Sequence, residues 1–415
     1  MLLKSDIKKI RELQMLSVKG TKTGIPREIL SGFSVPSKHA VILTGIRRCG
    51  KSTLLFQLME DKYPDAFYLN FDDNRFYGFE TNDLLRLDEV IKESKSTLLF
   101  FDEIQEIPGW ERYVRQKLDE NYRLVITGSN SSLLSLEMGS KLTGRHINKE
   151  LFPFSFNEFL EAKKIKNGEN AVKSYIKEGG FPEFLTSGRD EILANLFEDI
   201  LIRDIAVRHG IRDIKGLQRL ALWLVSNGSN RITGTRLKKT LNISATSTIM
   251  EYFSHLESAY LFYFIPKFSY SFRSQIISPR KLYCADTGLI SVNSASFTDD
   301  SGRKLENIIF NHLRSQYNSI FYYSGKNECD FIVTRKGKKP AVIQVCDTLD
   351  RDNLDREAGG LFEAIEFFKL KEGLIVTMNQ TDTLTIKDFT AHIVPAWEFL
   401  TSPDLERRLF NGDGK

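Results

Sequence analysis

The chain has 415 residues, 41% of them hydrophobic and 27% charged, and its 58 Lys and Arg residues slightly outnumber its 54 Asp and Glu residues. A net charge of +4 excludes a histone-like cationic binder and an acidic tail, but it is compatible with one local basic face. The four cysteines, Cys49, Cys284, Cys329 and Cys346, form no C-x-x-C pair and have no histidine at metal-ligand spacing, so we expect a reducing cytoplasm and neither a zinc site nor a disulfide framework.

The N-terminal part alternates short apolar runs with helical patterns. A helical stretch from Ser5 to about Leu16 comes first, and the Lys and Asp residues mixed into the first ten positions exclude a secretory signal. Buried strands are then expected at 40–43, 66–71, 97–101 and 122–126. Helical patterns between them predict a parallel α/β sheet with crossover helices. No apolar run approaches the about 18 residues of a membrane span.

The middle of the chain has a different pattern. Residues 150–212 are helical in composition, with breaks at Pro153 and around Gly179, Gly180 and Pro182. Helices are expected next at 216–227, 233–242 and 244–259, and the aromatic stretch 260–272 alternates like two strands. Three helices followed by two strands are typical of a winged helix-turn-helix.

The last of those three helices would be the recognition helix. Small hydroxyl residues near its start suit phosphate or base-edge contacts, and basic residues precede it: Ser244, Thr246 and Ser247, then Arg236, Lys238 and Lys239. The sequence leaves two readings open. The unit either contacts DNA or serves in packing and protein contact.

The C-terminal part predicts a third α/β unit. Helices are expected at 303–316 and 355–369, and strands at 319–323, 329–334, 341–346, 373–378 and 391–394.

The strongest motif is GIRRCGKS at 45–52, which matches G-x-x-x-x-G-K-[ST] between a strand and a helix. Gly45 and Gly50 allow backbone N–H groups to wrap around phosphates, Lys51 reaches the β- and γ-phosphates, and Ser52 ligates Mg²⁺. ATP or GTP binding is therefore predicted. Arg47 and Arg48 either contact phosphate or face outward. The predicted nucleotide-binding residues are Gly45, Ile46, Arg47, Arg48, Cys49, Gly50, Lys51, Ser52 and Thr53.

A second motif, LLFFDE at 98–103, ends a strand in two carboxylates. Asp102 would hold Mg²⁺ through water, and Glu103 would polarise the attacking water. The strand LVITGSN ends in Ser129 and Asn130, either of which would orient that water, whereas Thr127 lies deeper in the strand. Arg145 is either a stabiliser of transition-state charge or a solvated surface arginine.

Taken together, these motifs resemble a family of bacterial and archaeal AAA+-type P-loop ATPases with a characteristic C-terminal domain of unknown function. The resemblance covers residues from about 20 to 345 and rests on GIRRCGKST, FFDEIQEIPGWE, ITGSNSSLLS, LTGRHINKELFPFSFNEFL, EGGFPEFL, DILIRDIAVRHGIRD, SATSTIMEYFSHLESAYLF and RKLYCADTGLI. It implies Walker A at Gly45–Thr53, Walker B at Asp102 and Glu103, and a sensor at Asn130 or Ser129. The GGFPE stretch implies a contact of Pro182 with the base, with a helix-breaking turn as the alternative.

The C-terminal order α-β-β-β-α-β resembles the PD-(D/E)xK nuclease fold, with Glu306 on the helix and Asp330 on a strand. Working members hold Mg²⁺ with such an acid and an E-x-K motif. Here the corresponding positions are Gln344 and Cys346, and cysteine does not supply the positive charge of lysine. We therefore expect a degenerate, inactive nuclease-like site.

The resulting prediction is an α/β, Mg²⁺-dependent ATPase of the cytoplasm in three parts: a P-loop domain with a helical lid (20–212), a winged-helix domain (213–290) and a nuclease-like domain (300–400). Hydrolysis would switch the arrangement of the later domains on DNA, a protein partner or a second copy of the chain. Two alternatives stay open. One is an ATP-binding, DNA-binding module with negligible turnover, and the other is a metal-dependent nuclease regulated by ATP.

Overall fold

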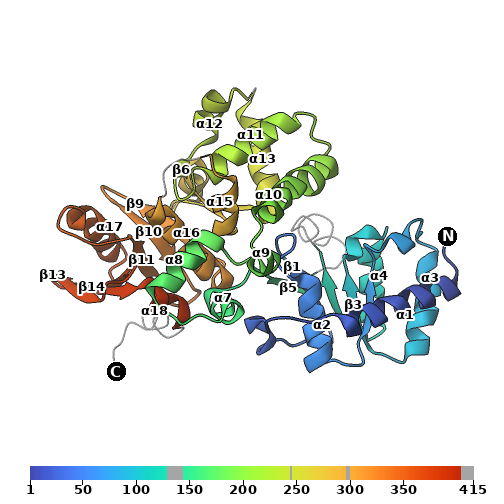
Figure 1. Cartoon of the computed structure of the whole chain (residues 1–415). Helices are drawn as coiled ribbons and strands as arrows, with labels where there is room; N and C mark the ends of the chain where they lie inside the picture. Colours follow the sequence, from blue (N-terminus) through green and yellow to red (C-terminus); the bar gives the residue numbers. More distant parts are fainter. Residues whose placement is uncertain (129–143, 244, 296–299, 403–415) are drawn as a thin grey trace. The chain divides into compact units, whose positions relative to one another are not determined.

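The first 152 residues build a parallel α/β sheet in the computed structural model, which describes residues 1–128, 144–243, 245–295 and 300–402. In the described part of this segment, five strands lie in the order β2-β3-β4-β1-β5, and every neighbouring pair is parallel. They are β1 (Ala40–Thr44), β2 (Phe67–Asn70), β3 (Leu98–Asp102), β4 (Arg123–Thr127) and β5 (His146–Glu150). The four strands expected from the sequence and the predicted fold class are confirmed (Figure 1).

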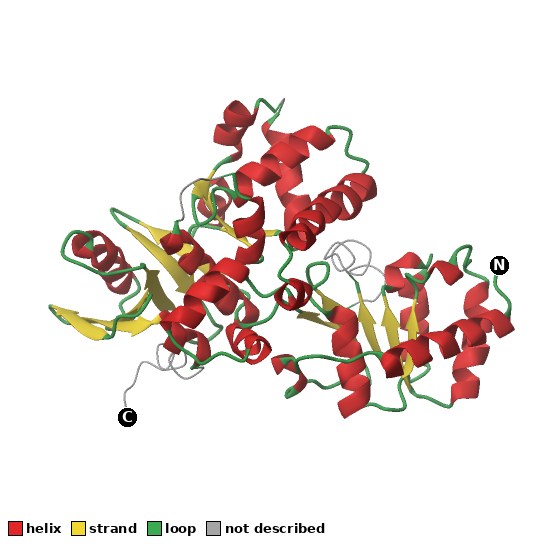
Figure 2. Ribbon diagram, viewed as in Figure 1, coloured by secondary structure: helices red, strands yellow, loops and turns green. Residues whose placement is uncertain are grey.

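Helices connect these strands and surround the sheet (Figure 2). They are α1 (Lys4–Gly20), α2 (Lys51–Asp61), α3 (Asp83–Ser94) and α4 (Trp110–Asp119), with short 3-10 turns η1 (Glu28–Leu30), η2 (Asn74–Phe76) and η3 (Ile104–Glu106). All five residues of β1 and of β3 are buried, as in parallel strands covered on both faces. Those continuous apolar runs are the reason why the sequence reveals these two strands.

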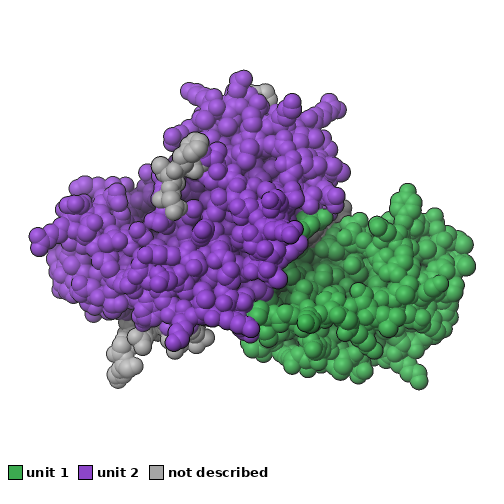
Figure 3. All heavy atoms as spheres, in the orientation of Figure 1, with its two compact units in different colours: residues 1–152, 258–260 green, residues 153–257, 261–415 purple. Residues whose placement is uncertain are grey.

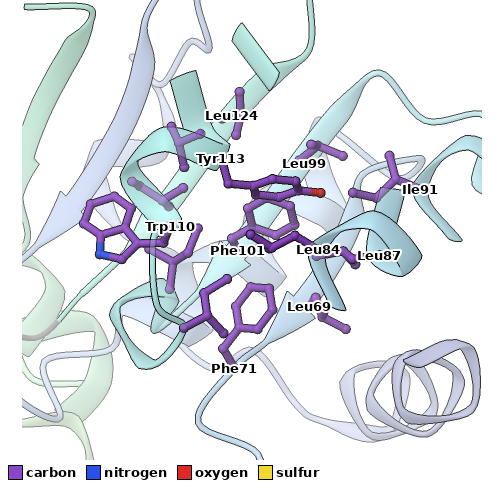
Figure 4. Packing of buried hydrophobic residues seen from close by; sticks show 14 of the residues in the cluster. Leu69, Phe71, Leu84, Leu87, Ile91, Leu99, Phe101, Trp110, Tyr113 and Leu124 are labelled. Atoms are coloured by element: carbon purple, nitrogen blue, oxygen red, sulfur yellow. The ribbon is translucent and has the colours of Figure 1, made fainter. Parts of the chain in front are cut away.

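One face of the sheet packs against α3 and α4 in an aromatic core (Figure 4). Phe101 of β3 stacks on Tyr113 of α4, with ring centroids 6.2 Å apart. Phe71 makes an edge contact with Phe101 at 5.5 Å. Because such a core is close-packed, it fixes the carboxyl ends of the central strands, where the functional residues lie.

The second compact unit comprises residues 153–257 and 261–415, and the tripeptide 258–260 groups with the first unit (Figure 3). Its helices are α7 (Phe156–Lys163), α8 (Glu169–Glu178), α9 (Pro182–Ser187), α10 (Asp190–Asp199), the π-helix η4 (Ile200–Val207), α11 (Ile214–Val225), α12 (Gly234–Leu241), α13 (Thr246–Ser258), α14 (Phe272–Ile277), α15 (Thr287–Asn293), α16 (Ser301–Gln316), α17 (Leu354–Phe367) and α18 (Ala396–Thr401).

Two sheets belong to the described part of this unit, with strand orders β6-β8-β7 and β13-β14-β12-β11-β10-β9. Their strands are β6 (Arg231–Ile232), β7 (Phe262–Ile265), β8 (Arg280–Cys284), β9 (Ile320–Ser324), β10 (Glu328–Val333), β11 (Ala341–Val345), β12 (Glu372–Thr377), β13 (Asp382–Ile386) and β14 (Phe389–Pro395). Every helix and strand expected after residue 300 is present. Strand β13 is an addition that the sequence does not predict, because its residues are mostly exposed and form no apolar run.

The aromatic stretch 260–272 corrects one prediction, because only β7 forms in it and the second expected strand does not. Pro266 follows β7 and has no backbone N–H to continue the ladder. The chain then pairs with β9, where the Phe268 N–H donates to the Tyr322 carbonyl at 2.7 Å. Ser271 caps the N-terminus of α14 by accepting from the Ser274 N–H, so the segment turns into a helix.

The boundary between the compact units lies at 152 and 153, so residues 153–212, expected as a lid of the P-loop domain, belong to the second unit. The three-domain division predicted from sequence stays a prediction. Among the helices of the described ranges, none combines the length and the apolar character needed to cross a membrane.

Candidate nucleotide site

The loop 45–50 joins the carboxyl end of β1 to the first turn of α2 and has a conformation that only glycine adopts easily. Gly45 has φ 140° and Gly50 has φ 102°, both in the region that disfavours side chains. A Cβ atom on Gly45 would overlap the carbonyl oxygen of Leu151. The loop therefore lies tightly against the residues that follow β5, and its backbone leads directly into the N-terminus of α2, which favours anions.

Lys51 begins α2, and its side chain is buried over this loop. Its ammonium donates to the carbonyl oxygens of Gly45 at 3.0 Å and Ile46 at 3.2 Å. The positive charge is thereby held at the mouth of the loop, next to the free end of the helix dipole. This arrangement fits a phosphate chain in both charge and shape.

Ser52 and Asp102 lie together, although they are 50 positions apart in the sequence. Ser52 favours the charged form of the Asp102 carboxylate, and Asp102 accepts hydrogen bonds from Tyr68 at 3.1 Å and from Thr127. Burial and the neighbouring Glu103 carboxylate raise the pKa of Asp102, while these hydrogen bonds oppose that rise. A hydroxyl and a carboxylate in contact are the hard oxygen ligands that Mg²⁺ prefers, so the residues present fit this ion.

Glu103 follows Asp102 in a backbone conformation that is unusual for a residue with a side chain, with φ 49°. Its N–H donates to the Thr127 hydroxyl at 2.9 Å, and its carboxylate accepts from the side-chain amide of Gln105. Strained backbone of this kind persists only where surrounding contacts hold it, and it concentrates at functional sites. Thr127 thus connects both acids, because its hydroxyl donates to Asp102 and accepts from Glu103. From the sequence, Thr127 is a weaker candidate than the residues that follow it.

Arg27 is a residue of this site that no sequence motif indicates. Its buried guanidinium donates to the Cys49 carbonyl at 2.9 Å and to the Phe152 carbonyl at 2.7 Å. One side chain therefore ties the phosphate-binding loop to Phe152, which follows β5 by two residues. No local signal could have identified it, since only the fold brings residue 27 to residue 49. The segment around Arg27 also lines a cavity of about 730 Å³ along α2.

Other predicted residues differ in how they relate to the loop. Arg48 has φ 62°, a left-handed backbone that disfavours its side chain, and Thr53 continues α2. Arg145 precedes β5 and pairs with Asp119, at the end of the sheet opposite the loop. The five residues of β5 span about 16 Å, more than an arginine side chain reaches. Ser129 and Asn130 lie outside the described residues, as does Ser244.

The glycine–proline stretch has a clear packing role within the second unit. Pro182 is the first residue of α9, a position that suits proline. A Cβ atom on Gly179 would overlap the Asp286 carboxylate, and the Gly180 N–H donates to that carboxylate at 2.6 Å. Burial raises the pKa of Asp286 to about 6. The predicted contact of Pro182 with the base stays a prediction.

Three of the four predicted nuclease-like residues come together in the second unit. The Asp330 N–H donates to the side-chain oxygen of Gln344 at 3.2 Å, and the Gln344 amide donates to Glu357 at 2.7 Å. Asp330 and Glu306 both lie within 2.7 Å of the ammonium of Lys281. Cys346 belongs instead to the hydrophobic cluster under α17, where burial raises the pKa of its thiol to about 12.

Comparison with known proteins identifies related sequences over most of the chain. The family described as "AAA domain" matches residues 37–160, and the "Domain of unknown function (DUF8612)" matches residues 169–299. "Uncharacterized protein MJ1544" of Methanocaldococcus jannaschii is 34% identical over 399 residues, which cover 88% of each chain. An "Uncharacterized protein" of Haemophilus influenzae is 30% identical over 344 residues, which cover 75% of this chain and 85% of the relative.

Among solved structures, AMPPCP-bound DnaA from Aquifex aeolicus is similar over 60% of this chain and 88% of that chain, with 13% identity and a TM-score of 0.29. Values this low carry no conclusion about the present chain.

Proposed function

Since the chain belongs to a family of archaeal and bacterial AAA-type P-loop ATPases with a C-terminal domain of unknown function, we propose that it binds ATP with Mg²⁺ and hydrolyses it to switch its second unit. The observation that carries this proposal is the placement of Ser52 next to Asp102, beside the loop whose carbonyl oxygens accept from Lys51. Phosphate-binding and metal-binding groups thereby meet at one end of the sheet.

Nucleotide binding follows from the loop. The N–H groups of residues 45–52 and the N-terminus of α2 accommodate phosphate oxygens, and the Lys51 ammonium, now shared between two carbonyl oxygens, turns toward the more negative β- and γ-phosphates. Ser52 and Asp102 would hold Mg²⁺, which when bound neutralises charge that develops on the phosphates.

The acid that handles the water is Glu103. Its carboxylate accepts the proton of the attacking water, and the Gln105 amide fixes the direction in which that carboxylate points. Thr127 holds the Glu103 backbone through its hydroxyl, so the positions of base and metal ligand change together. This shared hydroxyl is the physical basis for coupling the two functions.

Arg145 would act on the phosphates of another chain and not on those of its own. Arg145 lies at the opposite end of its own sheet, where it pairs with Asp119, so in this proposal it serves a neighbouring copy of the protein in a homo-oligomer. A cytoplasmic location is part of this proposal, because free thiols persist in a reducing compartment. The free and buried thiols are Cys49, Cys284, Cys329 and Cys346.

DNA is the second candidate partner, through the region predicted as a winged helix. Arg236, Lys238 and Lys239 are exposed on α12 and suit phosphate contacts. In contrast, α13 exposes Glu251 and Glu257, which repel the phosphates beside a groove. These charges favour contacts of α12 with the DNA phosphate backbone over contacts of α13 with the DNA bases. A DNA-binding module with negligible turnover would use the same surface.

The test combines two substitutions in the full chain. Lys51→Ala should abolish ATP binding in titration calorimetry, and Glu103→Gln should retain binding but lose about 10²–10⁴-fold in turnover, the range for general-base catalysis. Glu106→Gln, an exposed acid three residues further on, is the matched control and should hydrolyse ATP normally. Unchanged affinity in Lys51→Ala would refute the site assignment.

Turnover with and without duplex DNA at two salt concentrations then separates the partners. If α12 binds phosphates, replacing its three cations by glutamine should reduce the salt slope of DNA binding by about one unit for each cation that had neutralised a phosphate. DNA retention without turnover in the wild type would favour the regulatory module over the ATPase.

A further inference from the structure

The second unit contains a buried cation that no motif indicates. The Lys281 ammonium, on β8, lies 2.7 Å from Glu306, 2.9 Å from Glu328 and 2.7 Å from Asp330. Its side chain is only 3% exposed, and those of Glu306 and Asp330 are 11% and 8% exposed. The ammonium donates hydrogen bonds to Glu306 and Asp330 and forms an ion pair with Glu328.

Each of these carboxylates has a further donor from the protein. The Tyr283 hydroxyl donates to Glu306 at 2.6 Å, and the Val345 N–H donates to the second oxygen of Asp330 at 2.9 Å. Arg231 pairs with Glu328 at 3.0 Å. The acids are therefore held around a fixed central position by donors from β6, β8 and β11.

The Lys281 ammonium lies where the nuclease-like fold is predicted to bind its metal ion, because Glu306 and Asp330 are the expected ligands of that ion. Gln344 is held by other partners, because its side-chain oxygen accepts from the Asp330 N–H and its amide donates to Glu357. Among the described residues, no group of three or more His, Cys, Asp or Glu side chains is arranged to hold a metal ion.

We propose that the Lys281 ammonium permanently occupies the position that a metal ion would take between these acids. The nuclease-like unit therefore binds no divalent ion and cleaves no phosphodiester. Removal of the Lys281 side chain creates a metal site from Glu306, Glu328 and Asp330. The inference goes beyond the ATPase proposal and is independent of it. It explains why the Glu306 and Asp330 carboxylates remain buried in a protein that lacks the E-x-K lysine.

The surroundings of the ammonium agree with a permanent role. The Lys281 side chain is only 3% exposed and contacts both Glu306 and Asp330. Removal of the ammonium would leave these two buried acids without a counter-charge. Its oxygen neighbours, at 2.7–2.9 Å, need to move inward by only a few tenths of an ångström to reach the about 2.3–2.6 Å of a Ca²⁺-sized ion.

The experiment measures Tb³⁺, a Ca²⁺-sized luminescent ion, on the full chain. Lys281→Ala should gain one bound Tb³⁺ per chain, excited through Tyr283, and the added Asp330→Asn substitution should abolish that gain. Lys281→Met removes the charge but fills the space, so it should gain no site. In calorimetric unfolding, Tb³⁺ should increase the stability of the Lys281→Ala variant. It should not increase the stability of the double variant with Asp330→Asn or of Lys281→Met.

Wild-type protein keeps the proposal testable even if Lys281→Ala fails to fold. A wild-type Tb³⁺ or Mn²⁺ site that Asp330→Asn abolishes would overturn it, as would Mn²⁺-dependent plasmid nicking that requires Asp330. A folded Lys281→Ala protein with no added ion would overturn it as well. Because none of these measurements uses ATP, their failure is distinguishable from failure of the ATPase proposal.

Discussion

The Thr127 hydroxyl is the smallest group on which the candidate site depends. It donates to the Asp102 carboxylate and accepts from the Glu103 N–H at 2.9 Å. The two acids are adjacent in sequence but have different proposed roles, since Asp102 would hold Mg²⁺ and Glu103 would accept the proton of the attacking water. The hydroxyl fixes the two acids relative to each other. Residues that orient metal ligands and bases in this way influence activity without touching the substrate.

We predict that Thr127→Val, which keeps the side-chain shape and removes the hydroxyl, lowers ATP turnover by about 10–100-fold, the typical effect of losing an orienting partner. ATP binding should change much less, because the loop and Lys51 are unaffected. Steady-state hydrolysis and calorimetric titration measure the two effects separately. The control is Thr377→Val, an equally buried strand threonine of the second unit, and equal reductions of turnover in both variants would indicate general destabilisation instead.

At the scale of elements, α17 packs directly on β10 through one of two adjacent glycines. A Cβ atom on Gly360 would overlap the backbone carbonyl of Glu328, whereas one on Gly359 would meet only the side chain of Asn327 at 3.4 Å. Backbone does not move aside as an exposed side chain does. The two positions therefore differ sharply although they share the same helix.

This difference gives a matched pair of substitutions. Gly360→Ala should destabilise the second unit by about 1–3 kcal/mol through overpacking, while Gly359→Ala should be neutral or stabilise it by about 0.5–1 kcal/mol through better helix propensity. Urea unfolding followed by circular dichroism measures both. Similar effects in the two variants would contradict the close approach of α17 to β10.

The elements themselves could largely be predicted, and the exceptions have physical reasons. The strands β1, β3 and β4 are buried on both faces and appear as apolar runs. Strand β5 (HINKE) is an edge strand with exposed residues, so neither its burial nor its alternation marks it. The segment after β7 has the alternation of a strand, but Pro266 and the cap at Ser271 determine another structure.

For the whole molecule, the division into two compact units allows nucleotide binding to be located. We predict that AMPPCP raises the thermal unfolding midpoint of the first unit. Its free energy of unfolding should rise by about 2.7 kcal/mol at an AMPPCP concentration of 100 times Kd. Scanning calorimetry should resolve that transition from the second, and Lys51→Ala should abolish the shift. A shift in the unfolding transition of the second unit would measure the coupling that the switch requires. If AMPPCP shifts neither transition, the result would argue against nucleotide binding.

The sequence by itself indicated the loop 45–50, the adjacent acids Asp102 and Glu103 and most of the elements, because those features depend on local spacing and on burial patterns within short segments. Only the tertiary structure revealed the roles of Arg27 beside Cys49, of Thr127 between the two acids and of Lys281 among Glu306, Glu328 and Asp330. These contacts join residues about 20 to 50 positions apart. Hydrogen bonds and ion pairs form between atoms that the fold brings within about 3 Å of each other, and no local pattern encodes such pairs.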